Sequence, residues 1–511
     1  MGNEMNCNLT NFANDIEIDV DESLVQHIQT NEKFDYKNKR YSKLLKLFFT
    51  KQTLLYPKND INLSQFKTNI KKLKKKILSI KKDTEPDKYY SLSCILGAFL
   101  GDSLGSYCEF CNKNEENYKK IFKGDNKFKK PPGQITDDSE MAFSFAFAIL
   151  DTLNLKEIDS NIIYYYYGCW FKSKPFDCGK TISNALKFFN FQKNIGDDIL
   201  KDIKFPEINE TSLSNGFLMR INTFVVWFYY CYYNYLNNII KSDDKNKFLE
   251  LFNLIKKEGL KDNICTHLNK EVNSATGFFV FLALIAMLDY SADIILNKFD
   301  ILLSNEFTDS YDKLVFKNIN SALNDLNKSD FNKDLFFYPY GKYYGYYFYS
   351  FKLTLYYLKF FDNYNEDSDN DYSKFRVIMN EICNLGGDTD TNCAIVGTVI
   401  GPIIGLDNFG YDLKILLKFI PNDRIQYTNS LIYYYVEFLD KNKEQLKKKK
   451  KNKYNNNNDN DSDDSEIINP LTDNDNDNDN IEDEKKQHKK KNVNYCTLNM
   501  LLSIIHTNID N

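Results

Sequence analysis

The chain has 511 residues, and its 66 basic residues against 71 acidic ones give a formal net charge of −5. This near-balance excludes a protein that is basic throughout and coats nucleic acid, so we expect no direct nucleic-acid binding. Hydrophobic residues make up 42% of the chain and aromatic residues 15%. Such a chain can bury a sizeable core, which excludes a protein that is disordered along its whole length.

The same composition bears on location and topology. The 11 cysteines are scattered along the chain with no secretory leader before them. This is typical of reduced thiols inside a cell, so we expect a cytoplasmic protein. The longest apolar runs, at 224–233 and 277–288, fall short of the about 18 to 20 residues that span a bilayer. We therefore expect no membrane span, and we expect a monomer.

Composition divides the chain into three parts. Residues 1–88 are acidic and then Lys-rich, with apolar residues between Ile70 and Ile80 at the spacing of an amphipathic helix, which is either a packing helix or a basic patch. Residues 441–511 combine lysine clusters with Asn and Asp tracts. Such sequence buries too little apolar surface to offset its ordering entropy, so we expect a disordered tail, whose lysines leave nuclear import as an alternative. The folded domain is expected at 89–440.

The first motif of that domain is a series of glycines at a spacing of four, Gly97, Gly101 and Gly105. A helix with this spacing has one face without side chains, against which a neighbouring helix can pack closely. A phosphate-binding loop is the alternative, but the Gly-x-x-x-x-Gly-Lys-Ser/Thr order of such loops is missing. We therefore favour close helix packing. Glu109 is then a carboxylate at the end of this helix, where it can face a cleft.

Apolar residues recur at helical spacing through most of the domain. One stripe begins at Met141, another at Ile182, and a stripe of small residues runs from Ala394 to Gly401. No run of alternating β-branched residues with hairpin turns is present. The pattern predicts a compact all-α domain with many helices.

Residues 296–375 are unusually rich in Asn, Asp and Ser. We interpret this segment as a set of expanded loops, at 318–332 and 362–373, around a helix near 345–360.

Two acidic clusters, more than two hundred residues apart, each precede a helical stripe. The first is Gln-Ile-Thr-Asp-Asp-Ser-Glu at 134–140, and the second is Gly-Gly-Asp-Thr-Asp-Thr-Asn at 386–392. Asp and Thr are ordinary helix caps, so capping explains each cluster alone. Together they can supply six oxygen ligands if the two helix starts meet, and such ligands favour Mg²⁺ or Mn²⁺ over zinc. With 4 histidines in the chain, a His-rich metal site is not expected.

Taken in chain order, five motifs resemble those of a known family. They are Gly-Asp-Ser-Leu-Gly at 101–105 with Glu109, Thr-Asp-Asp at 136–138, Ser-Asn-Gly-Phe-Leu-Met-Arg at 214–220, Thr-His at 266–267 and the cluster at 386–392. This order resembles the ADP-ribosylglycohydrolases, which include dinitrogenase reductase-activating glycohydrolase and the animal ADP-ribosylhydrolases. The resemblance covers about residues 90–420. It implies a compact all-α domain, two Mg²⁺ ions and hydrolysis of the bond between ADP-ribose and an acceptor, either an ADP-ribosylated protein or a small ADP-ribose conjugate.

The resemblance also implies roles for individual residues. The metal ligands would be Thr136, Asp137, Asp138, Asp388, Asp390 and Thr391. The substrate would be bound by Ser214, Asn215, Gly216 and His267, where the missing Cβ of the glycine allows the ligand to approach. Glu109 would be a mobile carboxylate at the substrate ribose, and either Asp138 or Asp390 would orient the attacking water.

Other interpretations stay open. The chain can be a catalytically silent member that binds ADP-ribose, or a structural protein, since family resemblance does not by itself secure turnover. The complete set of ligands favours an enzyme. The amino-terminal helix and the tail can also bind a partner independently of the catalytic domain, and for the apolar stretch at 496–505 we favour a weak, partner-dependent contact.

Overall fold

The computed structural model describes residues 77–122, 133–151, 158–172, 175, 177–189, 198–337 and 344–418. Within these ranges every regular element is a helix, and β pairing is limited to two isolated bridges. The predicted all-α class is confirmed. None of the described helices has both the length and the apolar character of a bilayer-spanning segment. The predictions for the tail, for the stretch at 496–505 and for most of the amino-terminal extension fall outside the described residues.

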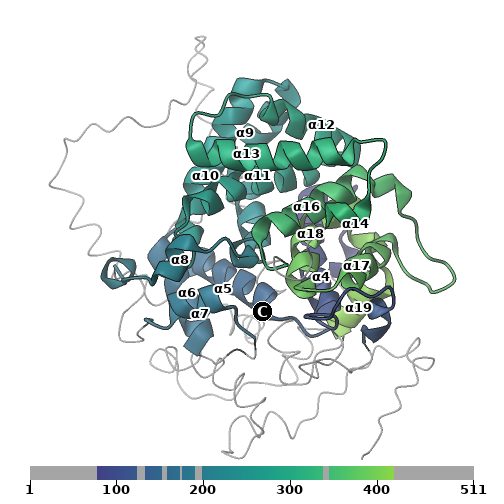
Figure 1. Ribbon diagram of the computed structural model, residues 1–511, viewed down its shortest axis with the longest axis horizontal. Helices are drawn as coiled ribbons and strands as arrows, with labels where there is room; N and C mark the ends of the chain where they lie inside the picture. Colours follow the sequence, from purple (N-terminus) through teal and green to yellow (C-terminus); the bar gives the residue numbers. More distant parts are fainter. Residues whose placement is uncertain are drawn as a thin grey trace, which may run out of the picture.

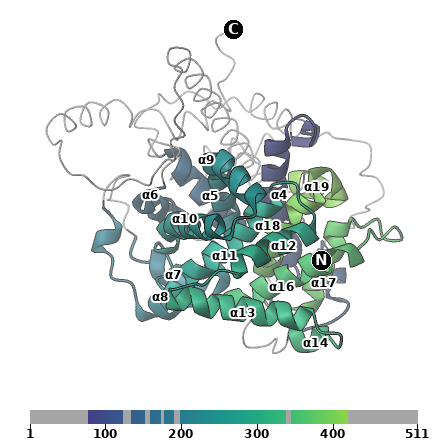
Figure 2. The same cartoon turned by 90° about the horizontal axis from the view of Figure 1, so that it is seen from above.

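The helices form three groups, with α9 to α13 at the top of Figure 1, α5 to α8 at the lower left, and α4 with α16 to α19 at the lower right. Figure 2 shows α11 and α18 in the middle of the assembly. Their bounds are α4 Pro86–Gly105, α5 Asp137–Asp151, α6 Ser160–Lys172, α7 Lys180–Leu186, α8 Glu207–Thr211, α9 Ile221–Ser242, α10 Lys245–Asn263, α11 Lys270–Ala286, α12 Ala292–Leu303, α13 Ser310–Leu326, α14 Lys333–Phe336, α16 Tyr347–Lys359, α17 Lys374–Leu385, α18 Thr389–Ile404 and α19 Gly410–Lys418.

Local sequence signals explain where several helices begin. Pro86 occupies the first turn of α4, a position where its missing N–H costs nothing. The side chains of Asp244, Asn269 and Asp309 accept hydrogen bonds from backbone N–H groups in the first turns of α10, α11 and α13. These caps satisfy donors that have no partner within their helix, and each contributes about 1 kcal/mol.

Helices α4 and α18 cross in backbone contact. A Cβ atom added to Gly97 would lie 2.4 Å from the carbonyl oxygen of Gly397, and one added to Gly101 would lie 2.2 Å from that of Cys393. Any side chain larger than hydrogen would force the helices apart. The predicted close packing is confirmed, and the partner of the glycine stripe is the small-residue stripe of α18. This crossing holds the end of α4 beside the start of α18, where the second acidic cluster lies.

The segment 296–375 is only partly the set of loops that we expected. The helix near 345–360 is present as α16. The segment 362–373 begins at the end of a short 3-10 helix, Phe361–Asn363, and continues as loop and turn with one bridge, Asp367 with Tyr372. The expectation of a loop at 318–332 is wrong for 318–326, because these residues belong to α13. The buried residues of α13 are Asp312, Val315, Ile319, Ala322 and Leu326.

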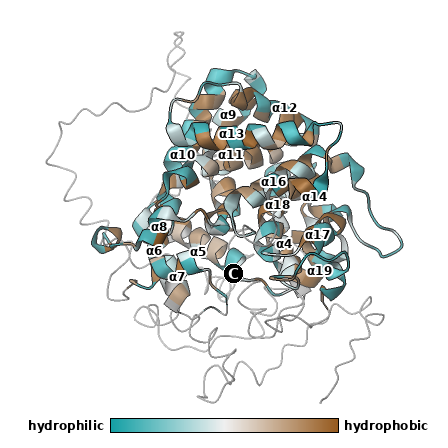
Figure 3. Cartoon of the chain, viewed as in Figure 1, coloured by the Kyte–Doolittle hydropathy of each residue, from teal (hydrophilic) through white to brown (hydrophobic). Residues whose placement is uncertain are grey.

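That spacing defines one face of a helix, and Figure 3 shows hydrophobic and hydrophilic segments alternating along α13. Burial of this face outweighs the weak helix propensity of the asparagines on the other side, which is only a few tenths of a kcal/mol per residue.

Candidate active site

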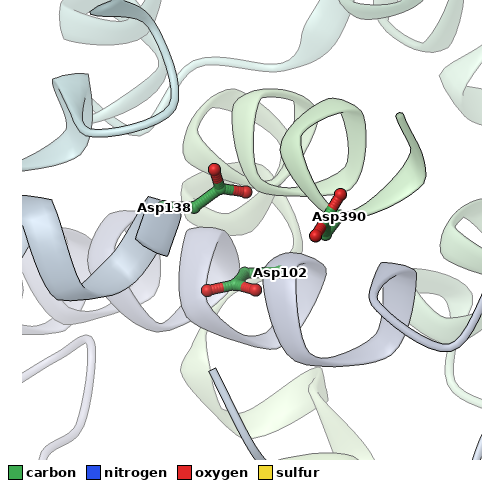
Figure 4. Close-up of side chains that lie close together, drawn as sticks. All are labelled: Asp102, Asp138 and Asp390. Atoms are coloured by element: carbon green, nitrogen blue, oxygen red, sulfur yellow. The ribbon is translucent and has the colours of Figure 1, made fainter. Parts of the chain in front are cut away.

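The centre of the site is a group of carboxylates carried by three helices. Asp102 lies on α4, Asp138 in the first turn of α5 and Asp390 in the first turn of α18, and Figure 4 shows the three side chains beside one another. One oxygen from each of them lies within 4.8 Å of the others. The two predicted acidic clusters therefore do meet in space. A second group, Glu109, Asp388 and Asp390, meets the same criterion, so Asp390 is shared between two adjacent groups.

Burial and mutual repulsion make this group electrostatically unfavourable without a cation. Burial, followed by the negative charge of Asp390, raises the pKa of Asp102, Asp138 and Asp388 above the ordinary range of a carboxyl group. Asp138 is 1% exposed, and its Oδ2 atom has no hydrogen-bond partner among the described residues. A buried carboxylate oxygen without a donor, facing other carboxylates, fits a ligand of a hard divalent cation.

Hydrogen bonds hold the start of α5 in place. Thr136 N donates to Asp102 Oδ2 at 2.9 Å, and Ser139 Oγ donates to the same atom at 2.5 Å. Asp102 is fully buried, so it acts as a fixed acceptor that anchors the first turn of α5 to α4. From α18, Thr391 Oγ1 donates to Asp138 Oδ1 at 3.1 Å.

The expected metal ligands are not all equally placed. Asp138, Asp388 and Asp390 lie in the two acidic groups, whereas Asp137 belongs to neither group among the described residues. Asp137 is 8% exposed, and burial together with the charge of Asp177 raises its pKa. Two hydroxyl side chains flank the carboxylates, those of Thr136 and Thr391, and both make hydrogen bonds with Asp138.

The loop after α4 places Glu109 at this site. Phe110 N donates to Gly387 O at 2.6 Å and Gly387 N donates to Cys111 O at 2.9 Å, so the two loops pair through their backbones. Gly387 has φ +82°, and a Cβ there would lie 2.7 Å from Tyr344 Cβ, so this position requires glycine. Phe110 is also left-handed (φ 58°), which is strained for a bulky residue and is a feature that often marks functional sites.

The predicted substrate loop lies on the other side of Asp388. Asn215 Nδ2 donates to Asp388 Oδ2 at 2.8 Å, and Asn215 N donates to Gly345 O at 2.9 Å. A Cβ at Gly216 would meet His267 and Ile182 at ordinary contact distances of 3.4 Å. Crowding by the protein therefore does not require glycine at this position. The segment at 344–346 was not expected to take part, but it joins the substrate loop to the metal loop.

His267 lies behind the substrate loop in a fully buried position. Its Nε2 atom is 2.9 Å from Ser214 Oγ, and its Nδ1 atom is 2.9 Å from Thr266 Oγ1. Burial, and then the positive charge of Arg220, lowers the pKa of His267 from 6.5 to about 3. The imidazole is therefore neutral at neutral pH. The structure thus brings together His267 and Ser214, two of the residues that the family resemblance assigned to the substrate.

Asp102 is the residue of this site that sequence reasoning missed. It belongs to the Gly-Asp-Ser motif at 101–103, but an aspartate inside a glycine-rich helix gives no signal of its own. The position of Asp102 in the sequence was the available signal, because Gly101 and Gly105 predicted that another helix covers this face of α4. A carboxylate beside that face is then buried, and a buried carboxylate needs donors or a cation.

Comparisons with known proteins identify the family of the chain. The family model described as ADP-ribosylglycohydrolase matches residues 85–429. A protein of Acanthamoeba polyphaga mimivirus named as an ADP-ribosyl glycohydrolase is 29% identical over 332 residues, which is 61% of this chain and 86% of the relative. The ADP-ribosyl-[dinitrogen reductase] glycohydrolase of Rhodospirillum rubrum is 32% identical over 103 residues, 19% of this chain and 33% of the relative.

A solved structure described as an ADP-ribosylglycohydrolase-related protein complex superposes with a TM-score of 0.42 at 20% identity, covering 69% of this chain and 99% of that chain. The family model and the two named relatives show that the chain is a hydrolase of glycosidic bonds. The chain belongs to the ADP-ribosylglycohydrolase family.

Proposed function

We propose that the chain is a Mg²⁺-dependent hydrolase that cleaves the glycosidic bond between ADP-ribose and an acceptor, on an ADP-ribosylated protein or a small ADP-ribose conjugate. The observation that carries this proposal is the convergence of Glu109, Asp138, Asp388 and Asp390 from distant segments of the chain. A silent ADP-ribose-binding member would be free to lose these carboxylates, so we favour turnover.

The chemistry of the side chains supports the choice of ion. Oxygen ligands favour Mg²⁺, with Mn²⁺ as the alternative, and the sharing of Asp390 by two groups supports a pair of ions. The ligands would be Thr136, Asp137, Asp138, Asp388, Asp390 and Thr391. When bound, such ions supply Lewis acidity that lowers the pKa of a water molecule.

The residues of the chain perform the remaining steps. Departure of the acceptor from ribose C1 passes through an oxocarbenium-like transition state. Glu109, in the loop after α4, acts there as a mobile carboxylate at the substrate ribose. Asp138 or Asp390 orients the attacking water and takes its proton. The loop at 214–216 holds the ribose and the diphosphate. The backbone pairing of Phe110 with Gly387 keeps Glu109 beside Asp388 while this occurs.

A substrate panel tests the proposal directly. Purified protein would be incubated with arginine-linked, serine-linked and poly(ADP-ribose) substrates, O-acetyl-ADP-ribose and an ADP-ribosylated nucleic-acid end, in Mg²⁺ or in EDTA. We expect release of ADP-ribose from at least one substrate, loss of release in EDTA and recovery when Mg²⁺ is added back. Protein that binds Mg²⁺ in calorimetry but releases ADP-ribose from none of the panel would contradict the proposal.

A pair of variants tests the role of Glu109. Glu109→Gln keeps the shape of the side chain but removes its negative charge and its ability to exchange a proton. We therefore expect the rate of hydrolysis to fall by about 100-fold or more. Glu116→Gln is the matched control, because Glu116 is exposed and pairs only with Lys119 among the described residues. Near-normal hydrolysis by a metal-loaded Glu109→Gln protein would show that the assignment is wrong.

The tail and the location of the protein stay predictions. Deletion of residues 441–511 should leave hydrolysis unchanged, and an accompanying change in partners or in location would support a separate role for the tail. We propose a monomer in the cytoplasm, with nuclear import through the lysine clusters of the tail as the alternative.

A further inference from the structure

A continuous chain of buried hydrogen bonds runs from the interior of the domain to the substrate loop. Arg220 Nε donates to Asp262 Oδ2 at 3.0 Å, and Arg220 Nη2 donates to Thr266 Oγ1 at 2.7 Å. Thr266 Oγ1 is 2.9 Å from His267 Nδ1, and His267 Nε2 is 2.9 Å from Ser214 Oγ. Arg220, Asp262, Thr266 and His267 are each no more than 1% exposed. Ser214 is the partly exposed end of this chain of bonds, and it directly precedes Asn215, which contacts Asp388.

The direction of each hydrogen bond follows from the chemistry of arginine. A guanidinium group only donates, so Thr266 Oγ1 accepts from Arg220. The hydroxyl hydrogen of Thr266 then needs an acceptor, and among the described residues His267 Nδ1 is the acceptor within hydrogen-bond distance of Thr266 Oγ1. In the opposite tautomer a buried hydroxyl would lose its only acceptor, which disfavours that tautomer by about tenfold or more.

The same reasoning extends to the substrate loop. With Nδ1 accepting, the imidazole proton lies on Nε2 and is donated to Ser214 Oγ. Ser212 Oγ also donates to Ser214 Oγ, at 3.2 Å. When His267 and Ser212 both donate to it, both lone pairs of Ser214 Oγ are occupied, and its hydroxyl group donates to Thr181 Oγ1 over a long 3.4 Å. Thr181 Oγ1 lies closer to Ser212 Oγ, at 2.8 Å, and in this arrangement it donates to Ser212. A ligand oxygen that only accepts would be a better partner for this proton.

We propose that Arg220 and Thr266 are positioning residues that hold His267 in the Nε2–H tautomer and thereby present Ser214 to the ligand as a hydrogen-bond donor. Arg220 also fixes the loop from within, because its Nη1 atom donates to Gly216 O at 3.1 Å. Asp262 holds the guanidinium group in place and in turn accepts from Tyr167 OH at 2.6 Å. The identity of the ligand rests on the proposed function, but the tautomer does not.

The tautomer can be measured without any assay of activity. Long-range nitrogen–proton correlation spectra of the full-length protein with ¹⁵N-labelled histidine distinguish a protonated from an unprotonated ring nitrogen. The chain has 4 histidines, so the signal that disappears in His267→Asn identifies His267. We expect an unprotonated Nδ1 and a protonated Nε2. A protonated Nδ1 in the wild-type protein would overturn the proposal, whether or not the protein hydrolyses ADP-ribose conjugates.

Two substitutions at Thr266 test the cause. Thr266→Val removes the hydroxyl group with little change in shape, so both tautomers of His267 should appear, and ADP-ribose should bind about tenfold more weakly in Mg²⁺ buffer. Thr266→Ser keeps the hydroxyl group and should restore the single tautomer and the affinity. A pure Nε2–H signal with unchanged affinity in Thr266→Val would refute the positioning role. If Thr266→Val does not fold, the comparison of Thr266→Ser with Thr266→Ala decides in the same way.

A failure of this proposal can be told from a failure of the proposed function. If His267 has the expected tautomer but the protein hydrolyses no conjugate, the positioning proposal is supported and the proposed hydrolysis is refuted. If the protein hydrolyses a conjugate but His267 has the opposite tautomer, the proposed hydrolysis is supported and the positioning proposal is refuted.

Discussion

Alanine in place of Gly105 should disturb the acidic site more than it disturbs the fold. The added Cβ atom would lie 2.3 Å from the carbonyl oxygen of Thr389 and 2.7 Å from Asp390 Cα, whereas real Cβ atoms keep at least 3.0 Å from their neighbours. The start of α18 must therefore move by about half an ångström or more. Metal sites tolerate deviations of about 0.2 Å in ligand distance. We expect the affinity for Mg²⁺ to fall by about 10- to 100-fold, as for other changes behind metal ligands.

Gly97→Ala is the matched control for this prediction. It places the same methyl group 2.4 Å from the Gly397 carbonyl oxygen, near the middle of both helices and about two turns from Gly105. Overpacking costs about 1 to 3 kcal/mol, and the better helix propensity of alanine returns up to about 1 kcal/mol. Urea unfolding in EDTA should show similar destabilisation of both variants, while calorimetry should show weakened Mg²⁺ binding only for Gly105→Ala. Equal Mg²⁺ affinity in the two variants would refute the reasoning.

Three further outcomes are expected. Asp388→Asn should remove a metal ligand and weaken Mg²⁺ binding in calorimetry. Undiminished Mg²⁺ binding would exclude Asp388 as a ligand. Asp262→Asn leaves Arg220 as an unpaired buried charge and should cost about 3 to 5 kcal/mol of unfolding free energy, whereas Asp325→Asn, at an exposed pair, should cost under about 0.5 kcal/mol. Burial keeps native His267 neutral down to a pKa of about 3, while the unfolded chain binds a proton below about 6.5. Stability is therefore lost as pH falls through this window, by about 1.4 kcal/mol per pH unit, and His267→Asn should remove that part of the slope in urea titrations at pH 6 and 4.5.

The all-α class could be predicted because helical periodicity is a local signal. The stripes that begin at Met141 and Ala394 required no knowledge of what covers them. The partner of the glycine stripe could not be predicted, because periodicity shows that a face is buried without showing which element buries it. In α13, weak local propensity indicated a loop at 318–326, and tertiary packing of Ile319, Ala322 and Leu326 overrode it.

The site shows the same division. Oxygen-bearing side chains at two helix starts predicted a common acidic centre because such a set is hard to explain by capping alone. The sequence could not show which side chains of one acidic cluster point toward the common centre and which point away from it. Glu140 accepts a hydrogen bond from Trp170 Nε1 at 2.7 Å, while Asp138, two residues earlier, faces Asp390. Asp102 was missed because its burial depends on donors, such as Ser139, that only the folded chain brings to it.

The crossing of α4 with α18 also determines when the site first exists during synthesis of the chain. Thr389 Oγ1 donates to Gly105 O across 284 residues of sequence. Ribosomes add about 5 to 20 residues per second, so a nascent α4 waits about 15 to 60 seconds for the helix that covers its glycine face. A translation product that stops before residue 389 carries most of the helices and no acidic centre. The two acidic groups can therefore form only after Asp388 and Asp390 have been synthesised, late in the translation of the domain.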